Sequence, residues 1–134
     1  MRRRPDPLDD PLRAAEAHVA ALADELTRPR AGECLLCYTA RMLEEGGCDG
    51  TLRWVRRWRD VRLPRATALE RRLGGRGAYC DCEVFLNGWT VGDHLAQPGP
   101  DGEPEWPDTR PGCVGVSARS SQPCANWVPH RRGW

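Results

Sequence analysis

The chain has 134 residues, 40% of them hydrophobic, and a formal net charge of +1. This length suits one domain, and the near-neutral charge provides no overall field that would attract nucleic acid or a membrane surface. No apolar run approaches the roughly 20 residues that a membrane span requires, so no membrane partner is predicted.

The N-terminal region predicts a disordered segment followed by a helix. Residues 1–10 are rich in Pro, Arg and Asp and have almost nothing to bury, which favours disorder. Asp10-Pro11 is typical of a helix start, with an N-cap residue before a proline in the first turn. A helix ended by Pro29 is predicted because apolar residues then recur every three or four positions: Leu12, Ala15, Val19, Leu22 and Leu26.

Three further helices are predicted before the composition changes. They cover about residues 34–45, 49–61 and 64–73, and Gly46-Gly47 and Gly74-Gly75 end the first and the third. Residues 79–86 favour a short extended segment. The fold class predicted is thus mainly α, with about four helices, a short β segment and a cysteine metal site in a small single domain at 11–96. Residues 97–134 are predicted to form an irregular C-terminal arm, because they are rich in Pro, Gly and Ser and lack periodicity.

The cysteines are the most informative residues of the sequence. Five of the seven lie in the first 82 residues: Cys34, Cys37, Cys48, Cys80 and Cys82. Cys34 and Cys37 are spaced i, i+3 at a predicted helix start, so both sulfurs can lie on one side. Cys80 and Cys82 lie two apart in a predicted strand and would share a face. The two pairs could close a tetrahedral thiolate site, whose natural occupant is a structural zinc ion.

The compartment and the ligand set follow from the same cysteines. The basic start of the chain has no apolar stretch behind it, unlike a secretory signal, so a cytoplasmic location with reduced thiols is predicted. Cys48 could be the fourth ligand in place of Cys34 or Cys37, which leaves open which four of the five bind the ion. Cys113 and Cys124 form a separate pair that could add a ligand, bond to each other or do neither, and free thiols are the favoured interpretation.

Two other functions are consistent with parts of the sequence. Cys34 and Cys37 at a helix N-terminus could act as a thiol redox sensor or oxidoreductase, because a helix dipole lowers a thiol pKa. Residues 51–76 contain nine Arg against two acidic residues and could bind nucleic acid, although a solvated helix face is the favoured interpretation. No catalytic motif is present, so no catalytic residue is predicted.

Three stretches resemble a bacterial family known as domain of unknown function 2695. They are Gly32-Glu33-Cys34-Leu35-Leu36-Cys37-Tyr38, Gly47-Cys48-Asp49-Gly50-Thr51-Leu52-Arg53 and Gly77-Ala78-Tyr79-Cys80-Asp81-Cys82-Glu83-Val84. The resemblance implies that Cys48, Cys80 and Cys82 belong together. Shorter members have Cys-Asp-His where this chain has Cys48-Asp49-Gly50, so a possible His ligand is missing here. The family has no established activity, so the resemblance implies little about function. From the cysteine pattern we expect a zinc-stabilised binding or adaptor module whose partner is unknown, a protein being one possible partner.

Overall fold

The computed structural model describes residues 10–131, so most of the predicted disordered N-terminus and the last three residues of the arm lie outside the described part. The helical segments are α1 (Pro11–Leu26), α2 (Leu35–Gly46), α3 (Arg53–Arg62), α4 (Leu69–Gly74), α5 (Asp81–Glu83), the π-helical turn η2 (Val84–Gly88) and the 3₁₀ turn η3 (Asp93–Leu95). The strands are β1 (Trp89–Val91), β2 (Gln97–Pro98), β3 (Pro104–Glu105) and β4 (Trp127–Pro129). The predicted fold class, mainly helical with short strands, is confirmed.

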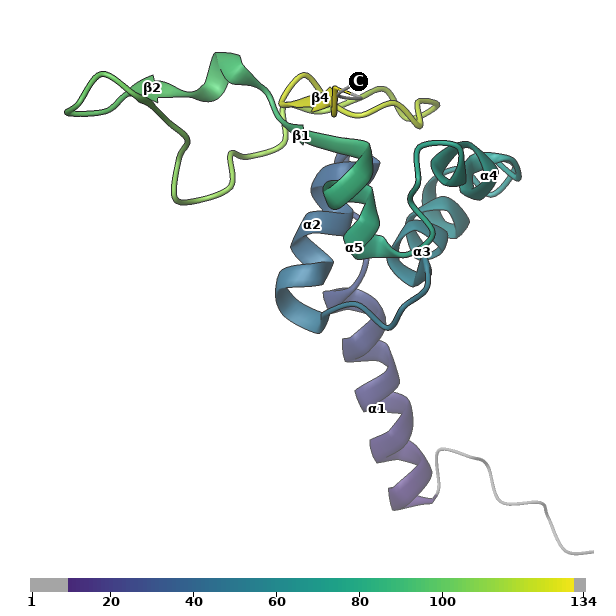
Figure 1. Ribbon diagram of the computed structural model, residues 1–134. Helices are drawn as coiled ribbons and strands as arrows, with labels where there is room; N and C mark the ends of the chain where they lie inside the picture. The colour runs from purple at the N-terminus through teal and green to yellow at the C-terminus, as the bar shows by residue number, and fades with distance from the viewer. Residues whose placement is uncertain (1–9, 132–134) are drawn as a thin grey trace, which may run out of the picture.

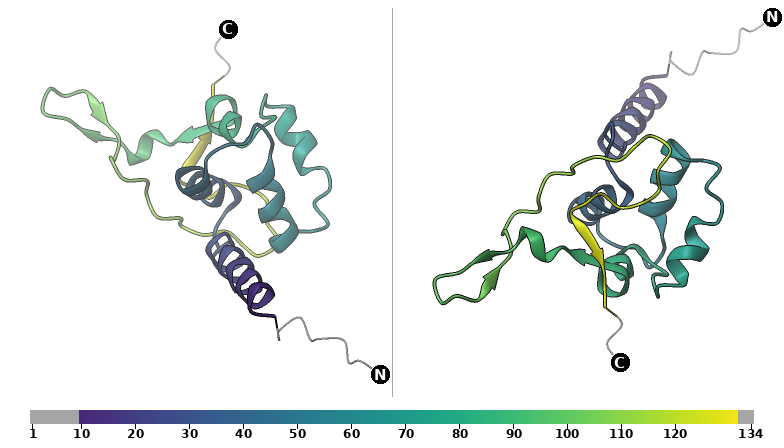
Figure 2. Two further views of the ribbon diagram at one scale, coloured as in Figure 1. Left: turned by 90° about the horizontal axis from the view of Figure 1, so that it is seen from below. Right: turned by 90° about the horizontal axis from the view of Figure 1, so that it is seen from above.

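Helix α1 extends away from the body of the protein (Figures 1 and 2). It begins as predicted, with the Asp10 carboxylate accepting from the backbone N–H of Leu12 at 3.0 Å. Its apolar stripe does not join the core, because α1 has no buried residue and Leu12 and Val19 are 67% and 63% exposed. The C-terminal end of the helix is tied down by Tyr38, whose hydroxyl donates to the carbonyl of Thr27.

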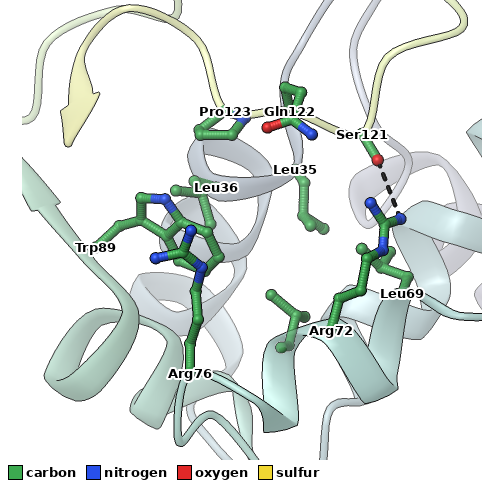
Figure 3. Close-up of a pocket in the computed structure, with 10 residues that line it drawn as sticks. Leu35, Leu36, Leu69, Arg72, Arg76, Trp89, Ser121, Gln122 and Pro123 are labelled. Carbon is green, nitrogen blue, oxygen red and sulfur yellow. Dashed lines mark hydrogen bonds between the residues drawn. The ribbon is translucent and has the colours of Figure 1, made fainter. Parts of the chain in front are cut away.

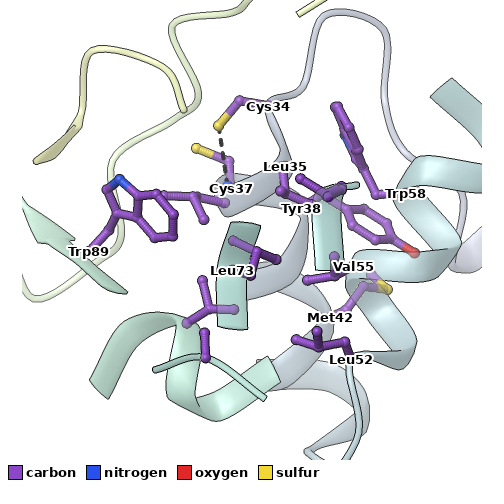
Figure 4. Packing of buried hydrophobic residues seen from close by; sticks show 14 of the residues in the cluster. Cys34, Leu35, Cys37, Tyr38, Met42, Leu52, Val55, Trp58, Leu73 and Trp89 are labelled. Atoms are coloured by element: carbon purple, nitrogen blue, oxygen red, sulfur yellow. Dashed lines mark hydrogen bonds between the residues drawn. The ribbon is translucent and has the colours of Figure 1, made fainter. Parts of the chain in front are cut away.

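Helix α2 is the centre of the core (Figure 4). Its N-cap is Cys34 in an extended conformation, and Gly47 ends it at φ 69°, a left-handed value that favours glycine. Its buried face includes Tyr38 and packs against α3, where Trp58 is also fully buried. The Trp58 indole N–H donates to the carbonyl of Glu33, which satisfies the polar atom of a buried ring.

The third and fourth predicted helices are shorter than expected. Helix α3 begins at Arg53, because the Asp49 carboxylate accepts from the N–H and hydroxyl of Thr51 and closes a turn there. Helix α4 begins at Leu69, since the chain after Pro64 forms a turn in which Ala66 N–H donates to the carbonyl of Leu63.

The extended segment predicted at residues 79–86 is wrong, because α5 and η2 occupy it. The reason is a helix-capping contact. The buried Asp81 carboxylate accepts from the backbone N–H groups of Trp54 at 3.0 Å and Val55 at 3.2 Å, at the start of α3. Its own N–H donates to the carbonyl of Thr51. These hydrogen bonds take the place of the strand pairing that was predicted. They also satisfy backbone N–H groups that have no partner within the first turn of a helix.

Replacing Asp81 with alanine is expected to lower the free energy of unfolding by about 2 kcal/mol, because the α3 N-terminus loses both acceptors in a buried setting. Urea denaturation followed by circular dichroism measures the loss. The matched control is Asp60→Ala on the exposed face of α3, which is expected to change the value by less than about 0.5 kcal/mol. Equal effects of the two substitutions would contradict the capping role.

The C-terminal arm returns to the body of the protein (Figures 1 and 2). It begins with the β2–β3 hairpin, and then residues 106–126 lead back to β4, which pairs antiparallel with β1 in the register Thr90 opposite Val128. The Trp127 ring lies 5.1 Å from the ring of Phe85. The arm thereby passes the N-terminal end of α2, where Val116 N–H donates to the carbonyl of Gly32 at 3.0 Å.

Candidate metal centre

Four cysteine sulfurs meet where the returning arm crosses the start of α2. The Sγ atoms of Cys34, Cys37, Cys113 and Cys124 all lie within 4.8 Å of one another. Three of these residues are buried and Cys113 is half-buried. All four are free thiols, with Cys37 Sγ 3.7 Å from Cys124 Sγ. This group brings together residues up to 90 positions apart in the chain.

Local backbone structure positions each pair of sulfurs. Cys34 is the N-cap of α2 and Cys37 lies in its first turn, so the i, i+3 spacing puts both sulfurs at one helix end, as the sequence predicts. On the arm, Cys113 precedes a turn in which Gly115 adopts φ 89°, a conformation suited to glycine. The Asn126 side chain donates to the carbonyl of Gly112 at 2.8 Å and so ties the two cysteine-bearing loops together.

Backbone and indole N–H groups point at the sulfurs. Cys34 Sγ accepts from the N–H of Cys37, and Cys113 Sγ accepts from the N–H groups of Cys34 and Gly115, each at 3.3 Å. Cys37 Sγ accepts from the indole N–H of Trp127 at 3.2 Å. Bonds of this kind stabilise thiolates more than thiols. The start of α2 adds the positive end of a helix dipole.

The arrangement fits a tetrahedral zinc ion held by four thiolates. Zinc–sulfur bonds of about 2.3 Å imply sulfur–sulfur edges of about 3.8 Å, close to the distance between Cys37 and Cys124. The hydrogen bond from the Cys37 thiol lowers the pKa of Cys34 to about 5. The same contact, together with burial, raises the pKa of Cys37. Four thiolates this close repel one another, so a bound cation is needed to hold all four ionised.

The structure divides the five predicted ligands between the two ends of α2. Cys34 and Cys37 lie at its N-terminal end, whereas Cys48 follows its C-terminal end. The twelve residues of α2 span about 18 Å between these two ends. Cys80 and Cys82 lie with Cys48, because Asp81 between them binds the start of α3. The predicted convergence of Cys34 and Cys37 with Cys80 and Cys82 therefore does not occur.

Cys113 and Cys124 are the site residues that sequence reasoning missed. They lie in a region without periodicity, so nothing placed them beside α2. A weak signal was present, because each is followed two positions later by a turn-forming residue, Gly115 and Asn126. Such residues permit tight turns in which backbone N–H groups face a metal-binding sulfur.

A family model described as "Protein of unknown function (DUF2695)" matches residues 35–87. This segment is therefore similar to the DUF2695 family. The chain is also 38% identical over 55 residues to proteins printed as uncharacterized from Mycobacterium bovis and from two strains of Mycobacterium tuberculosis. These alignments cover 41% of this chain and 56% of each relative, so the chain spans about half the length of the curated relatives it matches. No solved structure matches.

The DUF2695 segment contributes only part of the four-sulfur cluster. It contains Cys37, Cys48, Cys80 and Cys82, whereas Cys34, Cys113 and Cys124 lie outside residues 35–87. The cluster therefore joins the family segment to the C-terminal arm. Within residues 10–131, no helix has the length and apolar character needed to cross a bilayer.

Most arginines of the Arg-rich stretch at residues 51–76 have partners within the chain. Arg59 pairs with Glu70 at 2.6 Å, and Arg57 pairs with Asp24 of α1. Arg62 donates to the carbonyl of Arg30 at 2.7 Å, and the Arg53 guanidinium lies 4.3 Å from the ring of Trp54. Much of the positive charge in the Arg-rich stretch is therefore used in contacts within the chain, as expected for a structural helix face.

A cavity of about 310 Å³ lies between α2, α4 and the arm (Figure 3). Its apolar wall includes Leu36 and Trp89, and two arginines flank it. Arg76 lies 4.6 Å from the Trp89 ring, and Arg72 donates to the Ser121 hydroxyl at 3.3 Å. Pro123 lines the cavity on the arm side and directly precedes Cys124, so the position of this wall depends on the four-sulfur cluster.

Proposed function

We propose that this protein is a small zinc-stabilised binding or adaptor module without catalytic activity. One observation carries the proposal, namely four sulfurs within 4.8 Å at the junction of α2 and the arm. The ligands are Cys34 and Cys37 from α2 and Cys113 and Cys124 from the arm. The zinc ion supplies folding free energy that the modest core lacks, and holds the arm in place.

The binding part of the proposal rests on the cavity beside the cluster. Its apolar wall and flanking Arg72 and Arg76 suit a partner protein that inserts an apolar side chain with a carboxylate next to it. Zinc would keep residues 121–123 over α2 and α4 and so preserve this surface. A cytoplasmic location fits the proposal, because a reducing compartment keeps the seven thiols available for metal.

The two alternative functions have less support. A redox role for Cys34 and Cys37 needs an accessible thiolate, but these residues are 0% and 3% exposed. Nucleic-acid binding through residues 51–76 needs arginines free to contact phosphates, whereas Arg57, Arg59 and Arg62 are engaged with other parts of the chain.

Elemental mass spectrometry on protein purified without a histidine tag tests the proposal. The full chain is expected to carry zinc, and Cys124→Ser is expected to reduce its content by about one equivalent, because a hydroxyl is a poor substitute for a thiolate. The matched control is Ser121→Ala in the same loop, which is expected to retain all of the zinc. Less than about 0.2 equivalents in the wild type, with the fold unchanged by chelator, would overturn the zinc site.

A further inference from the structure

The cavity between α2, α4 and the arm has an apolar interior. Leu36 and Leu73, which are 1% and 2% exposed, line it together with Trp89 at the start of β1. Leu36 and Trp89 lie on one side of this space in Figure 3, with Pro123 of the arm above them. Its volume of about 310 Å³ is at the lower end of the range for ligand pockets, so it suits one large apolar group and not a helix.

The rim of the cavity carries two positive charges. Arg72 of α4 and Arg76, two residues beyond the helix, lie on either side of it (Figure 3). The ion pairs formed within residues 10–131 use neither of them. The acidic residue of α4, Glu70, is bonded to Arg59 at 2.6 Å. Two like charges therefore flank an apolar interior, and an anion bound there would offset their repulsion.

Both guanidinium groups are oriented by contacts that keep N–H donors available. The Arg76 guanidinium lies over the Trp89 ring, 4.6 Å from its centroid. Such a contact uses the flat face of the guanidinium, so the N–H groups along its edge can still donate. Arg72 donates from Nη2 to the Ser121 hydroxyl at 3.3 Å, and its other nitrogens keep their hydrogens for a further acceptor. The rim therefore suits a carboxylate, whose two oxygens match the guanidinium fork.

The carboxylate of a matching ligand must lie directly beside its apolar group. The Trp89 ring is part of the cavity wall and is also the ring on which Arg76 lies, so the apolar and the charged parts of the site are in contact. The last residue of a polypeptide carries an apolar side chain and a carboxylate on one Cα atom. In an extended segment, neighbouring side chains point to opposite faces, so an internal acidic residue next to an apolar one would be directed away from this rim.

We propose that this cavity binds the C-terminal residue of a partner protein. The apolar side chain of that residue contacts Leu36 and Trp89, and its α-carboxylate accepts from Arg72 and Arg76. This occupant, which rests on the proposed binding function, is the part of the partner that enters the cavity. Phenylalanine or leucine at the last position fills the space, whereas alanine leaves lining atoms without contacts.

Nuclear magnetic resonance of the ¹⁵N-labelled, zinc-loaded full chain tests the occupant with short peptides. The probe is an acetylated tetrapeptide of glycine and serine that ends in phenylalanine with a free carboxylate. It is expected to shift the indole N–H resonance of Trp89 to saturation. The same peptide with a C-terminal amide, and one ending in alanine, should bind about ten-fold more weakly, because one loses the charge and the other the apolar group. Equal affinity of the free acid and the amide would overturn the proposal.

A third peptide distinguishes the chain end from an internal carboxylate. It has glutamate next to phenylalanine within its sequence and an amidated end, and it is expected to bind about ten-fold more weakly than the free acid. Tighter binding of this peptide than of the free acid would contradict recognition of a C-terminus.

Charge variants test the arginines of the rim. Arg76→Gln is expected to weaken binding of the free-acid peptide about ten-fold, because a partner of the carboxylate is lost. The matched control is Arg71→Gln, since Arg71 is exposed on the same helix and does not line the cavity. It should leave the affinity within about two-fold of the wild type, because exposed charges interact weakly. Equal losses in the two variants would show attraction by overall charge instead of a site.

Zinc content measured on the same samples separates this site from the metal centre. Folded protein that holds one zinc and does not bind the free-acid peptide would overturn the C-terminal site and leave the four-sulfur cluster intact. Pro123 lines the cavity and precedes Cys124, so Cys124→Ser is expected to weaken peptide binding as well as remove zinc. Full peptide affinity in zinc-free Cys124→Ser would uphold the C-terminal site and overturn the role of zinc in holding its wall.

Discussion

Replacing Cys37 with serine is expected to lower the free energy of unfolding by more than about 4 kcal/mol. Binding of a structural zinc ion contributes about 10–16 kcal/mol in small zinc domains, and a missing thiolate forfeits a large part of it. The substitution also removes the sulfur that contacts Cys124 and accepts from the Trp127 indole, so the arm loses two of its attachments to α2. The melting temperature should fall by on the order of 15 °C.

Thermal unfolding followed by circular dichroism, with tryptophan fluorescence in parallel, measures this effect. The wild type is expected to melt at a higher temperature as free zinc is raised, whereas Cys37→Ser should respond much less. The matched control is Cys48→Ser, an exposed cysteine outside the four-sulfur cluster, which is expected to change stability by less than about 1 kcal/mol. Comparable losses in the two variants would contradict a structural role confined to the four-sulfur cluster.

Helix boundaries were predictable wherever a local signal decided them. Asp10-Pro11 and Gly46-Gly47 are signals that act within one turn of the chain. Helix α1 begins at the first and helix α2 ends at the second. The pairing of Cys34 with Cys37 was predictable for the same reason, because helix geometry alone places both sulfurs at one end.

The rest of the site depended on contacts between distant residues. Cys80 and Cys82 belong to a helical turn and not to a strand, because Asp81 caps α3. No local sequence pattern indicates this contact, which joins residues 27 positions apart. Cys113 and Cys124 lie at α2 because β4 pairs with β1 and Val116 binds Gly32. Tertiary pairing of this kind overrides local propensity and has no periodic signature in a Pro- and Gly-rich arm.

The apolar stripe of α1 shows a related limit of sequence patterns. The spacing of Leu12, Val19 and Leu26 correctly indicates an amphipathic helix. It does not indicate what the apolar face contacts, and here that face is exposed rather than packed on α2 or α3. Periodicity predicts the secondary structure and leaves its packing to be determined by the rest of the chain.

Replacing Arg41 with methionine is expected to lower the free energy of unfolding at neutral pH by about 3–5 kcal/mol. Arg41 forms a two-bond ion pair with Glu33, at 2.8 and 3.0 Å, and the side chains are 8% and 7% exposed. Removing one partner leaves an uncompensated buried charge, which costs far more than the loss of a surface pair. Arg41 also donates to the carbonyl of Arg28 and so fastens the segment between α1 and α2.

The exposed pair of Arg57 with Asp24 provides the control. Arg57→Met removes an arginine of the same size, but Asp24 is about half exposed and water can solvate it, so the expected loss is below about 1 kcal/mol. A double variant, Glu33→Gln with Arg41→Met, should recover part of the stability because no buried charge remains. Urea denaturation of the wild type and the three variants measures these differences, and similar losses for Arg41→Met and Arg57→Met would contradict the buried-charge argument.

The pH dependence of Arg41→Met gives a second and independent readout. In the wild type, burial raises the pKa of Glu33, but the hydrogen bonds from Arg41 and from the Arg30 N–H outweigh it, so the net pKa lies below the usual 4.5. The pair's contribution is therefore present at neutral pH and is lost as the pH falls through the lowered folded-state pKa. Without Arg41, burial raises the folded-state pKa above the unfolded value, so protonation favours the folded state. The stability deficit of the variant should therefore shrink as the pH is lowered from 7 toward 4.5, and a deficit independent of pH would show that Glu33 is not the charge left unpaired.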